Sequence, residues 1–324
     1  MTARTTQEWR AGDEWKFIPY LWSIVLAGGE GTRLAPMIRQ WLGGERPKQY
    51  CTFTGTRSML QHTVDRADCL AVPHQRLTVV GARQEEDARL QLSDRGGSLV
   101  IQPANRDTAP GVYLPLTYVR AADPRATVVI YPSDHFVHPE AQFIEAVRHA
   151  VLAVELLEDH LIFLGIQPDC LDLDYGYIHL DRFLGVYGPH SLWSVRRFVE
   201  KPDLQMARSF TKDQVLWNTM VIVAKLETLW RLGTSVLPSM MRQFETLLSA
   251  IGSPRESRVL TTIYETMPIR NFSMDLLEQV PHKVSVLDIK GLLWSDWGRP
   301  NRIAQSLRRI GKAPAFPAEL AGVA

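Results

Sequence analysis

The stretch "SIVLAGGEGTRLAP" (residues 23–36) begins with an apolar run and then places three glycines within four positions. Short apolar runs of this kind are typical of a strand buried on both faces of a parallel sheet. A glycine turn after such a strand lets backbone N–H groups approach a phosphate, because no side chain stands in the way. The spacing Gly29-x-Gly31-x-x-Leu34 lacks the third glycine of a dinucleotide-binding turn, and no Walker A sequence follows. The stretch therefore predicts a phosphate-binding turn of another kind, with an ordinary tight turn as the alternative.

Strand-like and helix-like segments alternate after this turn. Apolar runs predict strands at 22–27, 76–82, 98–103, 126–132 and 161–166, and amphipathic segments predict helices at 58–70, 109–122 and 141–160. Helix-length connections are what parallel neighbouring strands need. We therefore expect an α/β fold with a doubly wound, mostly parallel sheet. After about residue 225 the pattern becomes mainly helical, with further strands near 283–289 and 292–296.

The composition excludes several classes of protein. The 36 Lys and Arg nearly balance the 35 Asp and Glu, so no broad field attracts nucleic acid or an anionic membrane. No window reaches the roughly 18 apolar residues of a membrane span. Acidic residues precede the apolar stretch 17–27, which leads directly into the glycine turn, and this argues against an export signal. Three scattered cysteines, Cys51, Cys69 and Cys170, favour neither a disulfide framework nor a zinc site, so we expect a cytoplasmic protein.

The pattern divides the chain into an extension, one large domain and a tail. We expect an N-terminal extension at 1–20, a domain at 21–311 with two halves (21–160 and 161–311), and a tail at 312–324. The extension and the tail have the composition of poorly ordered segments. The oligomeric state stays open, with a homodimer as one alternative.

Several motifs together resemble one family. The chain carries "LAGGEGTRLAP" (26–36), "ERPKQY" (45–50), "QPANRDTAP" (102–110), "YPSDHF" (131–136), "DYGYI" (174–178), "FVEKP" (198–202), "LWNTMVIV" (216–223) and "WSDWG" (294–298). In this order they resemble the nucleotide-sugar pyrophosphorylases, and most closely the mannose-1-phosphate guanylyltransferase branch. The resemblance implies a Rossmann-like nucleotidyltransferase that joins GTP and mannose 1-phosphate to form GDP-mannose. The chain ends too soon for the long β-helix that many relatives append.

The resemblance assigns a nucleotide site to the first half. It implies that Arg33 holds the departing pyrophosphate and that Lys48 contacts the α-phosphate, whereas a solvated surface lysine is the alternative. Asn105 and Gln102 would approach the base, although Asp107 or Thr108 also suits a helix cap in this segment. The residues implied in nucleotide binding are Leu26, Ala27, Gly28, Gly29, Gly31, Thr32, Arg33, Lys48, Gln102 and Asn105.

A sugar-phosphate site is implied in the second half. A strand glycine such as Gly176 lets a flat sugar approach the backbone, and Asn218 offers both a donor and an acceptor. A simple bulge at Gly176 and a surface ion pair in "FVEKP" are the alternatives. The residues implied are Gly176, Tyr177, Glu200, Lys201 and Asn218, with Lys201 on the attacking phosphate.

Two aspartates suit a metal ion. Asp134 and Asp296 each follow an apolar strand-like run, so in a parallel-type sheet both would emerge at the ligand-binding edge. Repulsion between two such carboxylates is relieved by a cation, and Mg²⁺ favours carboxylate and phosphate oxygens. A structural role is expected for His135, and a cap near Trp297 is the alternative for Asp296. The expected catalytic set is Arg33, Lys48, Asp134, Lys201 and Asp296, with Mg²⁺ as cofactor.

The chemistry needs no general base. A sugar phosphate is largely a dianion at pH 7, so it can attack the α-phosphorus in line while pyrophosphate leaves. A non-catalytic regulatory homologue and a nicotinamide dehydrogenase are the rival interpretations. Base and sugar choice stay open, because "NFSMDLLE" (271–278) departs from the family pattern and carries no assigned residue. We also hypothesise that the loop at 35–46 closes over the triphosphate as a lid.

Overall fold

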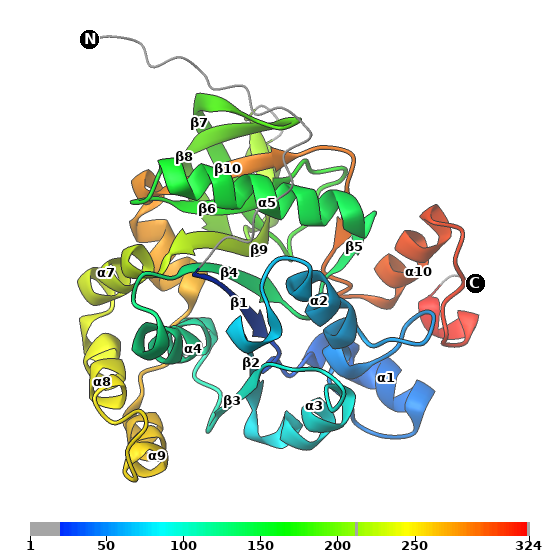
Figure 1. The fold of residues 1–324 in the computed structure, drawn as a ribbon. Coiled ribbons are helices and arrows are strands. Elements are labelled where there is room, and N and C mark those ends of the chain that lie inside the picture. The colour runs from blue at the N-terminus through cyan, green and yellow to red at the C-terminus, as the bar shows by residue number, and fades with distance from the viewer. Residues whose placement is uncertain (1–19, 211–212, 323–324) are drawn as a thin grey trace.

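The computed structural model describes residues 20–210 and 213–322, and its centre is a nine-stranded sheet covered by helices on both faces (Figure 1). The strand order is β3-β2-β1-β4-β9-β6-β10-β8-β7. This arrangement confirms the expected α/β class. The sheet is continuous across residue 160, because β4 of the first half pairs with β9 of the second.

The first four strands are parallel neighbours. They are β1 (Leu21–Leu26), β2 (Arg76–Gly81), β3 (Ser98–Gln102) and β4 (Thr127–Pro132). The register places Leu26 beside both Val79 and Pro132, so these strands end at a common edge. The glycine turn, Gln102 and Asp134 follow at that edge, where ligands of open α/β sheets bind.

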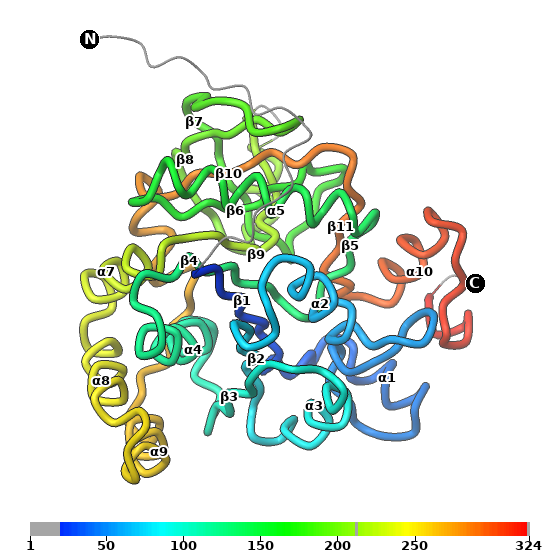
Figure 2. The backbone as a smooth tube through the Cα atoms, viewed as in Figure 1, coloured from blue at the N-terminus to red at the C-terminus, as the bar shows by residue number. Residues whose placement is uncertain are grey.

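The second half of the sheet is mixed. Its strands are β6 (Leu161–Ile166), β7 (Gly176–Tyr187), β8 (His190–Glu200), β9 (Val215–Lys225) and β10 (Val284–Ile289). The pair β6–β10 is parallel, whereas β9 is antiparallel to β4, β6 and β7. Because β7 pairs with both β8 and the start of β9, these five strands form a closed ring of pairings at the upper end of Figure 2. The sequence did not predict β7, β8 or β9.

Helices cover the two faces with separate apolar clusters. On one face lie α4 (Thr108–Ala122), α7 (Leu226–Val236), α8 (Pro238–Leu248) and α9 (Glu256–Thr266). On the other lie α2 (Met59–Asp68), α3 (Glu85–Gln91) and α5 (Glu140–Leu156). Each fully buried Val, Leu or Phe in them contributes about 1.5–3 kcal/mol. The mainly helical pattern predicted after residue 225 is confirmed by α7 to α9. The short helix α6 (Leu204–Ser209) follows β8.

A third cluster packs the C-terminal segment against residues between 34 and 59. It joins α1 (Ala35–Leu42) to α10 (Pro300–Arg309), beside each other on the right of Figure 1. At its centre the ring of Phe53 makes edge contacts with Trp297 at 5.6 Å and with Phe316 at 6.2 Å between centroids.

This cluster corrects two expectations. The predicted lid at 35–46 is not a free loop, because 35–42 form α1 and bury Met37 and Ile38. The tail at 312–324 is described to residue 322, and its predicted poor order is wrong there, because Phe316 is only 3% exposed. Residues 1–19 of the predicted extension lie outside the described residues.

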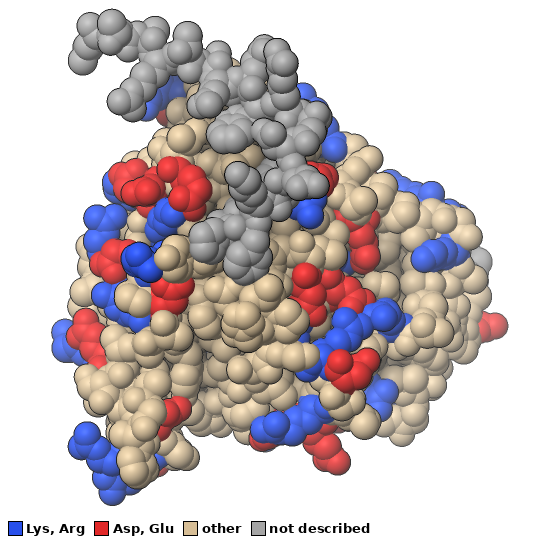
Figure 3. All heavy atoms as spheres, viewed as in Figure 1, with Lys and Arg blue, Asp and Glu red and all other residues tan. Residues whose placement is uncertain are grey.

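Surface charge follows the balanced composition. On the face in Figure 3, basic and acidic side chains are interspersed without a large area of one sign. Among the described residues, no helix is long and apolar enough to cross a membrane.

Candidate active site

The glycine turn is braced from below by the short 3-10 turn Lys48–Tyr50. The Gln49 amide donates to the carbonyls of Ala27 (2.9 Å) and Gly29 (2.7 Å), and the Tyr50 hydroxyl donates to Ala27 (3.1 Å). Gly31 has a φ of 61°, and a Cβ there would lie 3.0 Å from the backbone nitrogen of Lys48. Because its carbonyls are held this way, the turn has a fixed shape in which backbone N–H groups can meet a phosphate.

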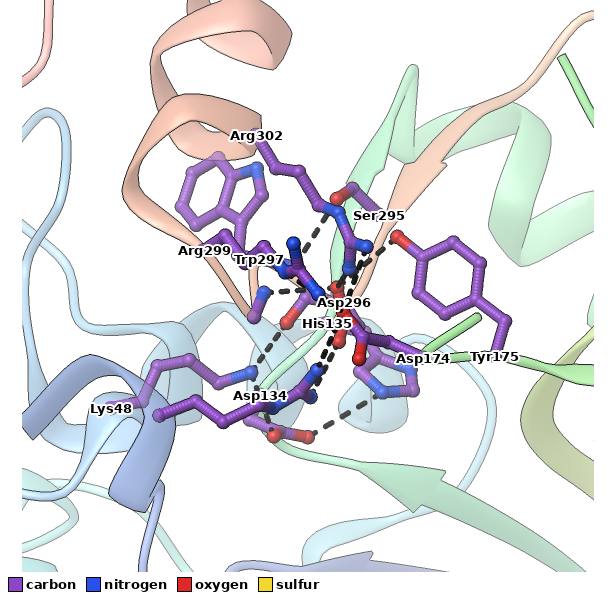
Figure 4. Close-up of polar contacts among 12 residues, drawn as sticks. Lys48, Asp134, His135, Asp174, Tyr175, Ser295, Asp296, Trp297, Arg299 and Arg302 are labelled. Atoms are coloured by element: carbon purple, nitrogen blue, oxygen red, sulfur yellow. Dashed lines mark hydrogen bonds and ion pairs between the residues drawn. The ribbon is translucent and has the colours of Figure 1, made fainter. Parts of the chain in front are cut away.

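Lys48 is a buried cation rather than a surface lysine. Its residue is 3% exposed, and its Nζ lies 2.9 Å from Asp134 Oδ2. The same ammonium donates to the main-chain carbonyl of Asp296 (Figure 4). Lys48 therefore brings together the two aspartates that the sequence proposed as metal ligands, and the solvated-lysine alternative is wrong.

The two aspartates meet by a different route from the predicted one. Asp296 follows β11 (Leu293–Ser295), which lies outside the main sheet and pairs antiparallel with β5 (Phe136–His138). Since β5 begins two residues after Asp134, this small sheet places Asp296 beside Asp134. The expectation that both aspartates leave strands of one parallel sheet is wrong.

Asp296 is the most heavily bonded carboxylate of the site. Its Oδ2 lies 2.7 Å from Arg33 Nη2. Its Oδ1 accepts hydrogen bonds from Arg302 Nη1 (2.9 Å), Tyr175 hydroxyl (3.1 Å) and Gly298 N–H (2.9 Å). The bond from Gly298 means that Asp296 also shapes its own turn, so the capping alternative holds in part.

Nearby cations control the ionisation of both aspartates. Burial alone would raise the pKa of Asp296, but Lys48 and Arg33 outweigh it and hold that pKa well below its ordinary value. Burial likewise raises the pKa of Asp134, and the charge and hydrogen bond of Lys48 are the main effects that bring it below its ordinary value. Both carboxylates are therefore charged at neutral pH. Their pairing stabilises the fold above about pH 4 and is lost as the pH falls through the lowered pKa values.

The donor set fits Mg²⁺. This ion is typically held by one or two carboxylates together with substrate phosphates rather than by a full protein cage. Asp134 and Asp296, brought together at Lys48, offer the two carboxylates that this mode uses. Among the described residues no group of three or more His, Cys, Asp or Glu could hold a metal ion. The ring of His135 packs edge-on against Trp294 at 5.2 Å, and burial lowers its pKa, in line with a neutral structural group.

Three predicted sugar-site residues meet on one face of the ring of strands. A Cβ on Gly176 would lie 2.6 Å from Glu200 Oε2 and 3.4 Å from Asn218 Cβ, so these side chains surround the bare backbone. Burial raises the pKa of Glu200, and Lys201 Nζ lies 3.5 Å from its Oε1. The side chain of Lys201 is 61% exposed, which leaves its ammonium accessible to an anion.

The side chain of Tyr177 points away from the predicted sugar site. Its ring is 2% exposed and packs on Phe210, and its hydroxyl bonds the backbone N–H and carbonyl of Asp172. Successive residues of a strand point to opposite faces, so the Tyr177 side chain leaves the face on which Glu200 and Asn218 surround Gly176. Tyr177 instead holds the loop between β6 and β7.

The segment predicted to contact the base has a mixed role. Gln102 is 7% exposed, and its Oε1 lies 3.5 Å from where a Cβ on Gly28 would stand, so it borders the glycine turn. Asn105 Oδ1 accepts from the Asp107 N–H at 3.0 Å, which shapes the turn before α4. Asp107 caps that helix through Thr108 N–H at 2.6 Å. The capping alternative is therefore confirmed, and base contact stays a prediction.

The sequence missed a second layer of charged residues around Asp296. Arg302 Nη2 lies 3.0 Å from Asp174 Oδ2 and also pairs with Asp172, and Arg299 Nε bonds Asp174 at 2.9 Å. The sequence offered only a weak signal for this layer. Asp172 and Asp174 stand two positions apart before a strand, and Arg299 and Arg302 stand three positions apart at the start of a helix. In "NFSMDLLE", Glu278 Oε1 accepts from Glu200 N–H at 3.2 Å, so this segment borders the predicted sugar site.

Gly298 allows Arg33 to reach Asp296. A Cβ at this position would lie 2.5 Å from Asp296 Oδ2 and 2.7 Å from Arg33 Cζ. We expect Gly298→Ala to displace the ion pair and to lower kcat about tenfold to hundredfold, because small misplacements at a reaction centre are costly. Steady-state kinetics would test this against Gly44→Ala, where a Cβ meets nothing within 4 Å. Equal activity of the two variants would contradict the expectation.

Comparisons with known proteins agree with this geometry. A model of the nucleotidyl transferase family matches residues 22–312. The chain is similar to the mannose-1-phosphate guanylyltransferase of Escherichia coli, with 26% identity over 285 residues, 85% of this chain and 59% of that protein. It is also similar to the xanthan biosynthesis protein XanB of Xanthomonas campestris pv. campestris (strain B100), with 32% identity over 200 residues, 60% of this chain and 40% of that protein.

A solved structure from Thermus thermophilus, described as a mannose-1-phosphate geranyltransferase, is similar with a TM-score of 0.74 and 27% identity, covering 89% of this chain and 79% of that one. The chain spans 59% and 40% of the lengths of the two curated relatives named above.

Proposed function

Because the chain belongs to the nucleotidyl transferase family, we propose that it transfers a nucleotidyl group from a nucleoside triphosphate to a sugar 1-phosphate and releases pyrophosphate. GTP and mannose 1-phosphate are the proposed substrates, in line with the name of the relative from Escherichia coli. The observation that carries the proposal is the meeting of the braced glycine turn with Lys48, Asp134 and Asp296.

The proposed reaction is an in-line displacement at the α-phosphorus. The phosphate of the sugar attacks, the bond between the α-phosphorus and the bridging oxygen breaks, and pyrophosphate leaves with the electron pair. The glycine turn binds the triphosphate, and Arg33 attracts the departing pyrophosphate. Lys201, exposed beside Glu200, steers the attacking phosphate. Catalysis then depends on alignment and charge stabilisation rather than on proton transfer.

Asp134 and Asp296 would hold Mg²⁺, which neutralises phosphate oxygens when bound. Lys48 keeps the two aspartates close and ionised through its contacts with both residues. The buried position of Lys48 makes this role more direct than the predicted contact with the α-phosphate, which stays a proposal.

Substrate choice is tested by pyrophosphate release from a panel of nucleoside triphosphates crossed with a panel of sugar 1-phosphates. We expect GTP with mannose 1-phosphate to give the highest kcat/KM, because a site that hydrogen-bonds one base leaves buried groups unpaired with another. A clear preference for dTTP or UTP would contradict the guanylyl assignment and leave the reaction class intact. Binding of the substrates without pyrophosphate release would favour the regulatory homologue.

We also propose a cytoplasmic location. All three cysteines are free, with Cys51 buried and the other two exposed, and a reducing compartment keeps such thiols reduced. A homodimer stays a prediction.

A further inference from the structure

The two oxygens of Asp296 have different partners. Oδ1 accepts three hydrogen bonds, from Arg302, the Tyr175 hydroxyl and the Gly298 N–H. Oδ2 is contacted by Arg33 at 2.7 Å. A carboxylate offers about four lone-pair sites over its two oxygens, so three donors saturate Oδ1. Oδ2 is therefore the oxygen that can change its partner.

The two arginines on Asp296 are held very differently. The side chain of Arg302 is 14% exposed, and its guanidinium lies 4.7 Å from the centroid of the Tyr175 ring. Its second nitrogen, Nη2, bonds both Asp172 and Asp174. Arg33 is 47% exposed, and its second contact, to Asp174, is 3.4 Å long. Arg302, which lies beside Asp174, Tyr175 and Asp296 in Figure 4, is thus the fixed partner. Arg33 is the exchangeable one.

Charge sharing explains why a fixed arginine is tolerable beside a metal ligand. One guanidinium faces three carboxylates, those of Asp172, Asp174 and Asp296. Its single positive charge therefore orients Asp296 without fully neutralising it. Asp172 and Asp174 come from the loop between β6 and β7, and Arg302 lies on α10, so their contact joins two segments far apart in sequence.

We propose that Arg302 is a positioning residue: it fixes Oδ1 of Asp296, so that Oδ2 faces the reaction centre and exchanges Arg33 for the metal ion. The proposal rests on the proposed function, because that function supplies the metal and the phosphates. Arg302 touches no reacting atom, so its loss affects the orientation of Asp296 more than substrate binding. We therefore expect a fall in kcat with little change in KM.

In a variant without Arg302 the affinity for the metal ion should rise while kcat falls. Arg302 Nη1 lies 2.9 Å from Oδ1 of Asp296, so removing Arg302 removes a positive charge beside the carboxylate that would hold the cation. This loss would favour binding of a cation roughly threefold to tenfold. A purely structural role predicts the reverse, since a damaged site loses metal affinity, stability and turnover together. A lower kcat together with a higher metal affinity therefore distinguishes a positioning role from a purely structural one.

The experiment compares Arg302→Ala and Arg302→Lys with Arg309→Ala. Arg309 is a matched control because it also lies on α10 and pairs with the same loop, through Asp169 at 2.9 Å. Thermal unfolding checks the fold, and steady-state kinetics gives kcat and KM. Water-proton relaxation, measured as the protein is titrated into Mn²⁺–GTP, gives the affinity for the metal complex without any turnover.

For Arg302→Ala we expect kcat to fall about tenfold to hundredfold, KM to stay within about threefold, and Mn²⁺–GTP to bind more tightly. Arg302→Lys should recover only part of the loss, because an ammonium cannot span the carboxylates as a planar guanidinium does. Arg309→Ala should match the wild type. A kcat of Arg302→Ala within twofold of wild type, or unchanged or weaker binding of Mn²⁺–GTP, would overturn the proposal.

The proposed function can fail separately. If the wild type releases no pyrophosphate with any substrate pair, the transferase assignment is wrong. In that case the relaxation measurement still tests the positioning role. Tighter binding of Mn²⁺–GTP by Arg302→Ala supports that role, and equal or weaker binding contradicts it.

Discussion

Asp296→Asn is expected to lower kcat by about a hundredfold or more, a loss comparable to removing a key electrostatic group from an active site. The amide keeps the shape of the side chain but removes the charge. Oδ2 then loses its ion pair with Arg33, and Oδ1 loses the charge-assisted bond from Arg302. Kinetics at several Mg²⁺ concentrations should show both the lower kcat and a raised requirement for the ion.

Asp169→Asn is the matched control for this prediction. Asp169 also pairs with an arginine of α10, Arg309 at 2.9 Å, but its side chain is 53% exposed and lies outside the site. Exposed ion pairs contribute little, so this variant should keep wild-type turnover. Near-wild-type turnover and Mg²⁺ dependence of Asp296→Asn would show that the two-aspartate metal site is wrong.

Lys48→Met is expected to lower kcat by about a hundredfold to a thousandfold, because one preorganised cation at a charge-transfer centre has about this effect. Methionine matches the length of the lysine stem, so packing around the 3-10 turn should persist. The substitution leaves Asp134 without its partner at 2.9 Å and frees the carbonyl of Asp296. Because Asp134 is 37% exposed, water replaces part of that interaction, and we expect a stability loss of about 1–3 kcal/mol.

The pH dependence of the stability loss in Lys48→Met tests whether the broken ion pair with Asp134 causes it. Lys48 holds the pKa of Asp134 below its ordinary value, so the pair stabilises the wild type above about pH 4. As the pH falls through the lowered pKa, Asp134 is protonated and the advantage of the wild type should shrink. Urea unfolding at several pH values measures the difference in stability between the wild type and Lys48→Met. The control is Lys225→Met, which removes an ion pair with Glu155 at 2.6 Å that lies remote from the site. A stability difference independent of pH would contradict the ion-pair explanation.

The predicted site residues whose place in the fold agrees with the sequence analysis lie within short motifs. The glycine turn follows β1 directly, and Lys48 comes one residue after a proline that fixes the local backbone. In such segments the residue types and the local chain geometry determine the arrangement. The proximity of Asp134 and Asp296 was also predicted, although the pairing of β5 with β11 rather than a parallel sheet produces it.

The parts that the sequence missed depend on long-range pairing. Arg302 contacts Asp172 across 130 positions and Asp174 across 128, and nothing local in either segment identifies the partner. The closed ring of strands that aligns the loop before β7 with α10 also went unpredicted. The outer half of β7 is mostly exposed and lacks the continuous apolar run that marks the buried strands.

Tyr177 shows a different limit. The motif "DYGYI" placed Gly176 and Tyr177 together in one site, but the alternation of the strand turns the Tyr177 side chain away from the face on which Gly176 meets Glu200. Gly176 faces Glu200, whereas Tyr177 packs on Phe210 on the other face. A motif identifies a segment, and the strand period decides which of its residues reach the ligand.

In the proposed reaction the bond that breaks lies between the α-phosphorus and the pyrophosphate of the nucleotide. The most direct test is to incubate the protein with Mg²⁺, mannose 1-phosphate and GTP labelled with ³²P at the α-position, and to separate the products. We predict that the label moves into a sugar nucleotide with the mass of GDP-mannose, in amounts equal to the pyrophosphate released and dependent on the sugar phosphate. Label that stays in GTP, or that appears only in GDP with release of inorganic phosphate, would contradict transfer of the nucleotidyl group to the sugar phosphate.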